Sequence, residues 1–162
     1  MVSVARKLTV AVGGTFEVLH KGHEALLSKA FEIGDYIYVG ITSDELARKL
    51  GKSPISSFQE RERRVKAFVD GLGKEYTLVK LEDPCGPLLN NDVNYVVVTT
   101  DTMARAMEAN EIRKRNGLSE VLIYVIPFIH AYDGQRISST KIKEGIMDRA
   151  GNKGSGQVQV GL

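Results

Sequence analysis

The chain has 162 residues, of which 43% are hydrophobic and 26% charged, and its formal net charge is +2 at pH 7. This length fits one domain that buries its own core, and the composition argues against extended disorder. Positive and negative residues are interspersed, so the basic stripe that duplex nucleic acid requires is missing. We therefore expect a globular domain that does not bind nucleic acid.

The single cysteine, Cys85, excludes a disulfide within the chain and fits a reducing compartment. No apolar stretch approaches the roughly 18 residues of a membrane-spanning helix, and the first residues lack the pattern of a secretory signal. We expect a cytoplasmic protein without membrane attachment. Residues 151–162, rich in glycine and polar side chains, predict a flexible tail after a domain of residues 1–150.

Five apolar runs of strand length alternate with helical patterns. The runs cover residues 8–12, 36–41, 76–81, 95–98 and 121–126. Strands that alternate with helices predict parallel pairing through crossovers. The expected fold is an α/β, Rossmann-like, doubly wound sheet of five parallel strands with helices on both faces, and its ligand should lie at the carboxyl ends of the strands where strand order reverses.

Four helices are expected between and after these strands. The first ends at Gly34, a residue type that often caps helix C-termini. Asp101 is expected to cap the third helix. The four helices should cover residues 24–33, 58–69, 101–116 and a stretch that begins at 138.

Two short patterns follow the first strand: Gly13-Gly14-Thr15-Phe16 and then His20-Lys21-Gly22-His23. Glycines let the backbone turn and approach a ligand closely, and free N–H groups at a helix start favour phosphate. His20 and His23 are three apart, so on a helical turn both rings point the same way. Imidazole donors placed in this way can hold the α-phosphate of a nucleotide and stabilise the charge that builds there during transfer.

From these patterns we expect His23 to be catalytic and His20 to help bind ATP. The backbone and side chains that should border ATP with it are Gly13, Gly14, Phe16 and Gly22. A pair of histidines without function is the alternative. It is disfavoured because this spacing directly follows a strand and two glycines.

A second phosphate-binding pattern begins the last expected helix, where Arg136 precedes Ser138, Ser139, Thr140 and Lys141. Hydroxyls at a helix N-terminus can bind the β- and γ-phosphates of ATP, and Arg136 or Lys141 can balance the charge of departing pyrophosphate. The alternative is that Ser138 only caps the helix. Together with the histidine motif, the pattern predicts ATP binding, with Lys141 as a catalytic residue.

Both motifs are those of the H-x-G-H nucleotidyltransferase superfamily, and the chain resembles its archaeal and eukaryotic phosphopantetheine adenylyltransferases over about residues 8–150. Three stretches carry this resemblance: residues 10–23, residues 40–47 with Gly40-Ile41-Thr42-Ser43-Asp44, and residues 137–149. It implies the reaction of ATP with 4′-phosphopantetheine to give dephospho-coenzyme A and pyrophosphate, in coenzyme A synthesis.

The resemblance implies a mechanism without a general base or a covalent intermediate. The nucleophile is a phosphate oxygen that is already ionised near neutral pH, so catalysis reduces to alignment and charge stabilisation. Thr15 resembles the hydroxyl that orients the incoming phosphate, and His23 resembles the ring that stabilises the transition state at the α-phosphoryl group. Mg²⁺ is expected to enter with ATP, and no metal site of the protein itself is predicted.

Further candidates are basic residues. Arg48, Lys49 and Lys52 follow the second strand, where they can hold the phosphate of 4′-phosphopantetheine, although a solvated charged surface explains them as well. On the third helix, Arg113 is preferred to Arg105 as an ATP contact. The loop at residues 84–87 either lines the pantetheine arm or is a simple turn.

Two other kinds of function stay open at this point. One is another small-molecule nucleotidylyltransferase, with nicotinamide mononucleotide, a flavin or glycerol phosphate as acceptor. Those branches usually differ from this chain at Glu17 or at Ser139, which favours pantetheine. The other is a regulatory module that binds a nucleotide without catalysis, and it is disfavoured because both phosphate motifs are intact.

Overall fold

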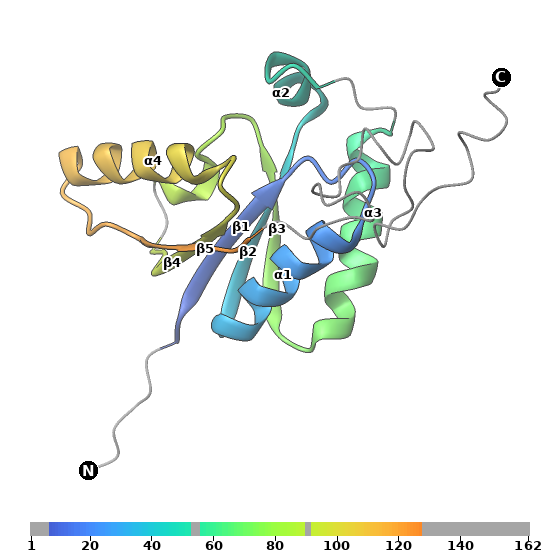
Figure 1. The fold of residues 1–162 in the computed structure, drawn as a ribbon, viewed down its shortest axis with the longest axis horizontal. Helices are drawn as coiled ribbons and strands as arrows, with labels where there is room; N and C mark the ends of the chain where they lie inside the picture. Colours follow the sequence, from blue (N-terminus) through green and yellow to red (C-terminus); the bar gives the residue numbers. More distant parts are fainter. Residues whose placement is uncertain (1–6, 53–55, 90–91, 128–162) are drawn as a thin grey trace, which may run out of the picture.

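A sheet of parallel strands with helices on both faces forms the part of the chain that the computed structural model describes, residues 7–52, 56–89 and 92–127 (Figure 1). The strand order is β3-β2-β1-β4-β5. The strands are β1 (Thr9–Gly14), β2 (Tyr36–Thr42), β3 (Glu75–Leu81), β4 (Tyr95–Val98) and β5 (Leu122–Val125). The helices are α1 (Lys21–Ile33), α2 (Asp44–Lys49), α3 (Phe58–Val69) and α4 (Met103–Arg115), with the 3₁₀ turns η1 (Asp70–Leu72) and η2 (Gly86–Leu88).

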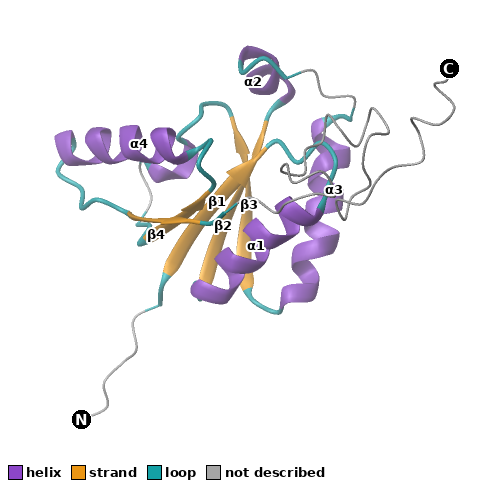
Figure 2. Cartoon of the chain, viewed as in Figure 1, coloured by secondary structure: helices purple, strands orange, loops and turns teal. Residues whose placement is uncertain are grey.

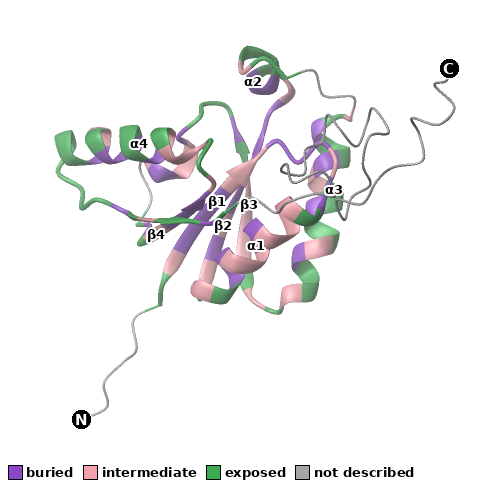
Figure 3. Cartoon of the chain, viewed as in Figure 1, coloured by how far each residue is buried: buried purple, intermediate pink, exposed green. Residues whose placement is uncertain are grey.

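The helices form two layers. Helices α1 and α3 cover one face of the sheet, and α4 with η2 covers the other (Figure 2). A cluster of buried apolar residues lies on each face of the sheet, and Figure 3 marks the buried residues in purple. Burial on both faces explains the apolar runs of the inner strands β1, β2 and β4. The predicted fold class and all five predicted strands are confirmed.

Two helix predictions need correction. Helix α2 was not expected; Ser43 begins it, and its hydroxyl accepts a hydrogen bond from the Leu46 N–H. Asp101 does not cap α4, because Thr102 occupies the cap position. The helix expected from residue 138 and the tail at residues 151–162 lie outside the described residues.

Gly34 caps α1 as predicted, but for a different reason. Its backbone is extended, with φ at −90°, so the residue does not need the left-handed conformation that favours glycine. A Cβ atom there would lie 2.7 Å from Cγ2 of Val10, a fully buried strand residue. Glycine therefore allows α1 to end directly against β1.

Replacing Gly34 with alanine should lower the free energy of unfolding by about 1–3 kcal/mol, because extra volume in a packed site forces strain. Gly71→Ala is the matched control, since a Cβ atom there meets nothing within 4 Å. Urea unfolding of both variants measures the difference. Equal stability of the two variants would contradict the packing explanation.

Candidate functional site

A cavity opens at the carboxyl ends of β1 and β4, where the strand order reverses. β1 pairs with β4 at Val10–Tyr95 and Ala11–Val96 and then continues to Gly14. Gly13, Gly14 and Gly40 line the cavity without side chains, and the space measures about 640 Å³ with its open mouth included. Such a volume suits a small-molecule ligand.

The walls of this cavity come from two segments, one at the end of β3 and one after β4. Leu81, Pro84 and Cys85 line it after β3, and Thr102 and Arg105 line it from the start of α4. The loop at residues 84–87 thus borders the cavity, and Asp83 shapes it by accepting hydrogen bonds from the Cys85 and Gly86 N–H groups. The lining is mainly apolar, with one guanidinium group.

His20 and His23 form a reciprocal cap at the start of α1. Nδ1 of His20 accepts hydrogen bonds from the N–H groups of Gly22 at 3.1 Å and His23 at 3.3 Å, and Nδ1 of His23 accepts from the His20 N–H at 3.4 Å. Because both Nδ1 atoms accept, each neutral ring carries its proton on Nε2. The rings stack with centroids 3.7 Å apart, which confirms that they point the same way.

The pKa of His23 falls from 6.5 to about 3, chiefly through burial and then through the charge of His20. The charge of Lys52 also lowers this pKa, whereas a hydrogen bond with the backbone of Val18 raises it. His23 is therefore a neutral ring near pH 7, with one N–H group to donate. A neutral donor can stabilise a developing negative charge without giving up its proton.

Phe16 holds His23 in place from the side. Its ring lies edge-on to that of His23 with centroids 5.1 Å apart. Its backbone has a φ of 54°, a strained value for a residue with a Cβ atom, and the side chain is only 1% exposed. The ATP contact expected for this side chain is thus not supported; Phe16 packs in the core beneath the histidines.

Two glycines of the motif give space to these rings. A Cβ atom at Gly14 would lie 3.2 Å from Cζ of Phe16, and one at Gly22 would lie 2.9 Å from Cε1 of His20. Gly22 was expected to keep the backbone beside the phosphates bare. In the structure it makes room for the His20 ring.

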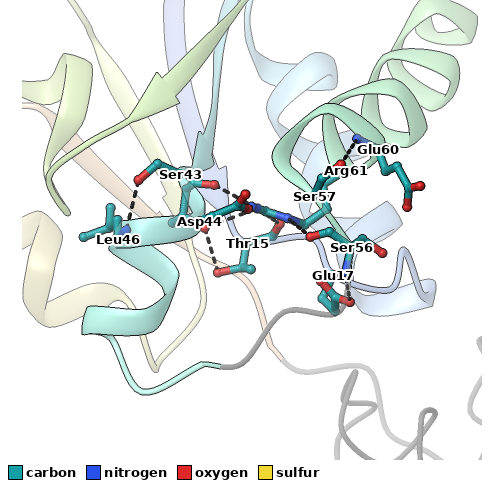
Figure 4. Close-up of polar contacts among 10 residues, drawn as sticks. Thr15, Glu17, Ser43, Asp44, Leu46, Ser56, Ser57, Glu60 and Arg61 are labelled. Carbon is teal, nitrogen blue, oxygen red and sulfur yellow. Dashed lines mark hydrogen bonds and ion pairs between the residues drawn. The ribbon is translucent and has the colours of Figure 1, made fainter.

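Thr15 directly follows β1, in the loop that leads to α1. Its hydroxyl accepts a hydrogen bond of 3.0 Å from the hydroxyl of Thr42 on β2. Arg61 of α3 is fully buried beneath both residues and donates to both of their carbonyl groups. Asp44 at the start of α2 pairs with Arg61 (Figure 4). The sequence analysis missed Arg61, although it interrupts the apolar stripe of Phe58, Val65 and Val69 on α3.

The basic candidates occupy different places. Arg48 and Lys49 are exposed on α2, and Lys49 forms an ion pair of 4.0 Å with Glu45. Lys52 is exposed just after α2, close enough to affect the titration of His23. No contact in the structure tests whether these three residues hold a phosphate, so this stays a prediction.

Arg113 is not among the residues that line the cavity. Its side chain is 3% exposed and donates hydrogen bonds of 2.7 Å to the carbonyl groups of Ser119 and Leu88. These bonds tie η2 to the connection between α4 and β5. The ATP contact expected for Arg113 is therefore not supported, and Arg105 is the arginine of α4 that borders the cavity.

No three His, Cys, Asp or Glu side chains gather into a metal-binding group within residues 7–52, 56–89 and 92–127. Asp35 and Asp44 have structural partners, the Leu8 N–H and Arg61 respectively.

The helices in this part of the chain are too short or too polar to span a bilayer. The residues of the second motif, Arg136, Ser138, Ser139, Thr140 and Lys141, lie outside the described residues.

Comparison with known proteins gives this site its class. The family model described as cytidylyltransferase-like matches residues 11–145, which include both motifs. A crystal structure of a protein of unknown function from Archaeoglobus fulgidus superposes with a TM-score of 0.68 at 36% identity, covering 74% of this chain and 89% of that one. The protein is a nucleotidyltransferase of the cytidylyltransferase-like class.

The particular family follows from curated relatives. The chain is 41% identical over 147 residues to the phosphopantetheine adenylyltransferase of Methanosarcina acetivorans, covering 88% of this chain and 93% of the relative. It is also 41% identical over 146 residues to the enzyme of the same name from Methanopyrus kandleri, with the same coverage. The chain belongs to the phosphopantetheine adenylyltransferase family.

The low pKa of His23 predicts how stability depends on pH. The unfolded chain takes up a proton on this ring below about pH 6.5, whereas the folded protein resists it down to about pH 3. The free energy of unfolding should therefore fall as the pH drops through this window. His23→Gln removes the titration, so its stability should fall less steeply.

Urea unfolding at several pH values between 7 and 4 measures the two slopes. Equal slopes for the wild-type protein and His23→Gln would contradict a buried, neutral His23.

Proposed function

We propose that this protein transfers the adenylyl group of ATP to 4′-phosphopantetheine, with dephospho-coenzyme A and pyrophosphate as products, in coenzyme A synthesis in the cytoplasm. The observation that carries the proposal is the stacked histidine pair at the start of α1, beside a cavity at the reversal of strand order. The reaction is the one after which the relatives are named.

The α-phosphate of ATP is placed by this proposal at the N-terminus of α1. There the Nε2–H groups of His20 and His23 can donate to its oxygens, and the positive end of the helix dipole attracts its charge. His23, neutral and partly buried, donates to the charge that grows as the bond to pyrophosphate breaks. Mg²⁺ belongs to the substrate as the ATP complex.

This proposal places the acceptor phosphate at Thr15, whose hydroxyl contacts that of Thr42. The phosphate oxygen is already ionised near neutral pH, so the site needs to align it and not to remove a proton. The exposed Lys52, and with it Arg48 and Lys49, supplies positive charge near this position. These assignments follow the sequence motifs and the position of Lys52 near His23.

The cavity suits the pantetheine arm of the acceptor. The arm is long, narrow and only weakly polar, and the lining by Leu81, Pro84 and Cys85 is correspondingly apolar. Arg105, near the start of α4, adds a positive charge that can pair with a phosphate of ATP or with the phosphate of 4′-phosphopantetheine. Arg136, Ser138, Ser139 and Thr140 are proposed to hold the β- and γ-phosphates, and Lys141 to neutralise departing pyrophosphate.

Substrate identity is tested by pyrophosphate release. The protein with ATP and Mg²⁺ should release pyrophosphate when 4′-phosphopantetheine is present. It should release much less with nicotinamide mononucleotide, flavin mononucleotide or glycerol phosphate. If one of these three is the better acceptor by a wide margin, or if no acceptor supports release, the proposal is wrong.

The role of His23 is tested by substitution. In His23→Ala, kcat should fall about 100- to 1,000-fold, since one donor to the transition state is lost. The KM for ATP should change little, because the donor acts mainly on charge that is absent from the ground state. Steady-state kinetics with varied ATP separates the two constants.

His20→Asn is the matched comparison, because asparagine retains an acceptor for the helix cap. Its loss of kcat should be smaller, with a larger share of the effect in KM. Near-normal turnover in His23→Ala would remove this ring from the mechanism.

A further inference from the structure

Arg61 is a buried cation placed beneath the acceptor side of the site. Its side chain is 0% exposed, and Asp44, whose carboxylate is 42% exposed, balances its charge. A buried guanidinium group is costly unless its N–H groups are paired. Here Nη1 donates to the carbonyl oxygens of Thr15 at 2.9 Å and Thr42 at 2.8 Å, and Nε donates to that of Ser56 at 3.3 Å.

These bonds join separate parts of the chain. Thr42 ends β2. Thr15 belongs to the loop after β1, and Asp44 lies in the first turn of α2 (Figure 4). All of them meet one rigid, planar group on α3. Because the fork of a guanidinium group fixes the directions of its hydrogen bonds, Arg61 sets the position of Thr15 relative to β2 and α2.

The hydroxyl groups above Arg61 have a defined direction of donation. Nη1 of Arg61 also approaches Oγ1 of Thr42 at 3.5 Å, and this hydroxyl donates to Oγ1 of Thr15 at 3.0 Å. An arginine side chain only donates, so Arg61 faces the oxygen of Thr42 and cannot take its proton, which is left for Thr15. The oxygen of Thr15 is thereby used as an acceptor, and its own proton points to a further partner.

We propose that Arg61, acting through Thr42, is a positioning residue that turns the hydroxyl proton of Thr15 toward the acceptor phosphate. The inference rests on the proposed function, which places that phosphate at Thr15. A phosphate dianion only accepts hydrogen bonds. A Thr15 hydroxyl turned the other way would direct a lone pair at the phosphate. The direction of the hydrogen bonds from Arg61 through Thr42 therefore decides whether Thr15 attracts or repels the substrate.

Thr42→Val tests the chain of hydroxyl groups, because valine keeps the shape of threonine and removes the donor. The KM for 4′-phosphopantetheine should rise about tenfold, the effect of weakening one hydrogen bond to a charged group. The KM for ATP should stay unchanged. Thr42→Ser retains the hydroxyl group and should restore the KM for 4′-phosphopantetheine.

Thr77→Val is the matched control, since Thr77 is also a strand threonine whose hydroxyl group contacts another side-chain hydroxyl, that of Tyr36. It should leave both KM values unchanged. A Thr42→Val enzyme with wild-type kinetics, or with equal changes in both KM values, would overturn the inference. Release of pyrophosphate by the wild-type enzyme with 4′-phosphopantetheine must come first; its failure overturns the proposed function itself.

Arg61→Lys tests whether Arg61 acts through Thr42 or whether Thr42 touches the substrate alone. Lysine keeps the charge but lacks the planar fork. If the two residues act through the same series of hydrogen bonds, the double variant Arg61→Lys, Thr42→Val should raise the KM for 4′-phosphopantetheine no further than the more severe single variant. Additive increases would overturn the inference. Asp44→Ala, which removes the acceptor of Nη2 of Arg61, replaces Arg61→Lys in the same cycle if that variant does not fold.

Discussion

The reciprocal hydrogen bonds between His20 and His23 are the constraint on which the site depends. They pair N–H groups at the start of α1 that would otherwise lack partners, and they leave the proton of each neutral ring on Nε2. The same bonds therefore begin the helix and prepare the donors. Gly22 is required because the His20 ring lies over it, and Phe16 supports His23 from the core.

The position of this cap follows from the sheet. β1 is central: the chain passes from it to β2 and β3 on one side, and then crosses from β3 to β4 on the other side. The carboxyl end of β1 therefore lies beside the gap that reversal creates, and α1 begins there. A parallel order with helices on both faces thus brings a helix N-terminus, bare glycines and a cavity together at this end of β1.

Much of the fold could be predicted from the sequence because the strands are buried on both faces and consist of plain apolar runs. Helix α2 could not, because its six residues are too few to show a period and it is held by Ser43 and by the pairing of Asp44 with Arg61. In the site, His23 and Thr15 belong to a local motif. The partners of Arg61 and Arg113 are distant in sequence, so neither role could be predicted.

Two arginines show why local sequence patterns do not predict the role of every residue near the site. Arg61 and Arg113 are both buried on helices and both bond to carbonyl groups, yet only Arg61 lies under the loop that carries Thr15. The strained backbone of Phe16 is adjacent to that loop, and strain persists only where surrounding contacts hold it. Burial of the Phe16 ring holds the loop from one side and Arg61 holds it from the other. Thr15 is thereby fixed before any substrate binds. Substrate binding therefore does not have to offset the entropy cost of ordering this loop.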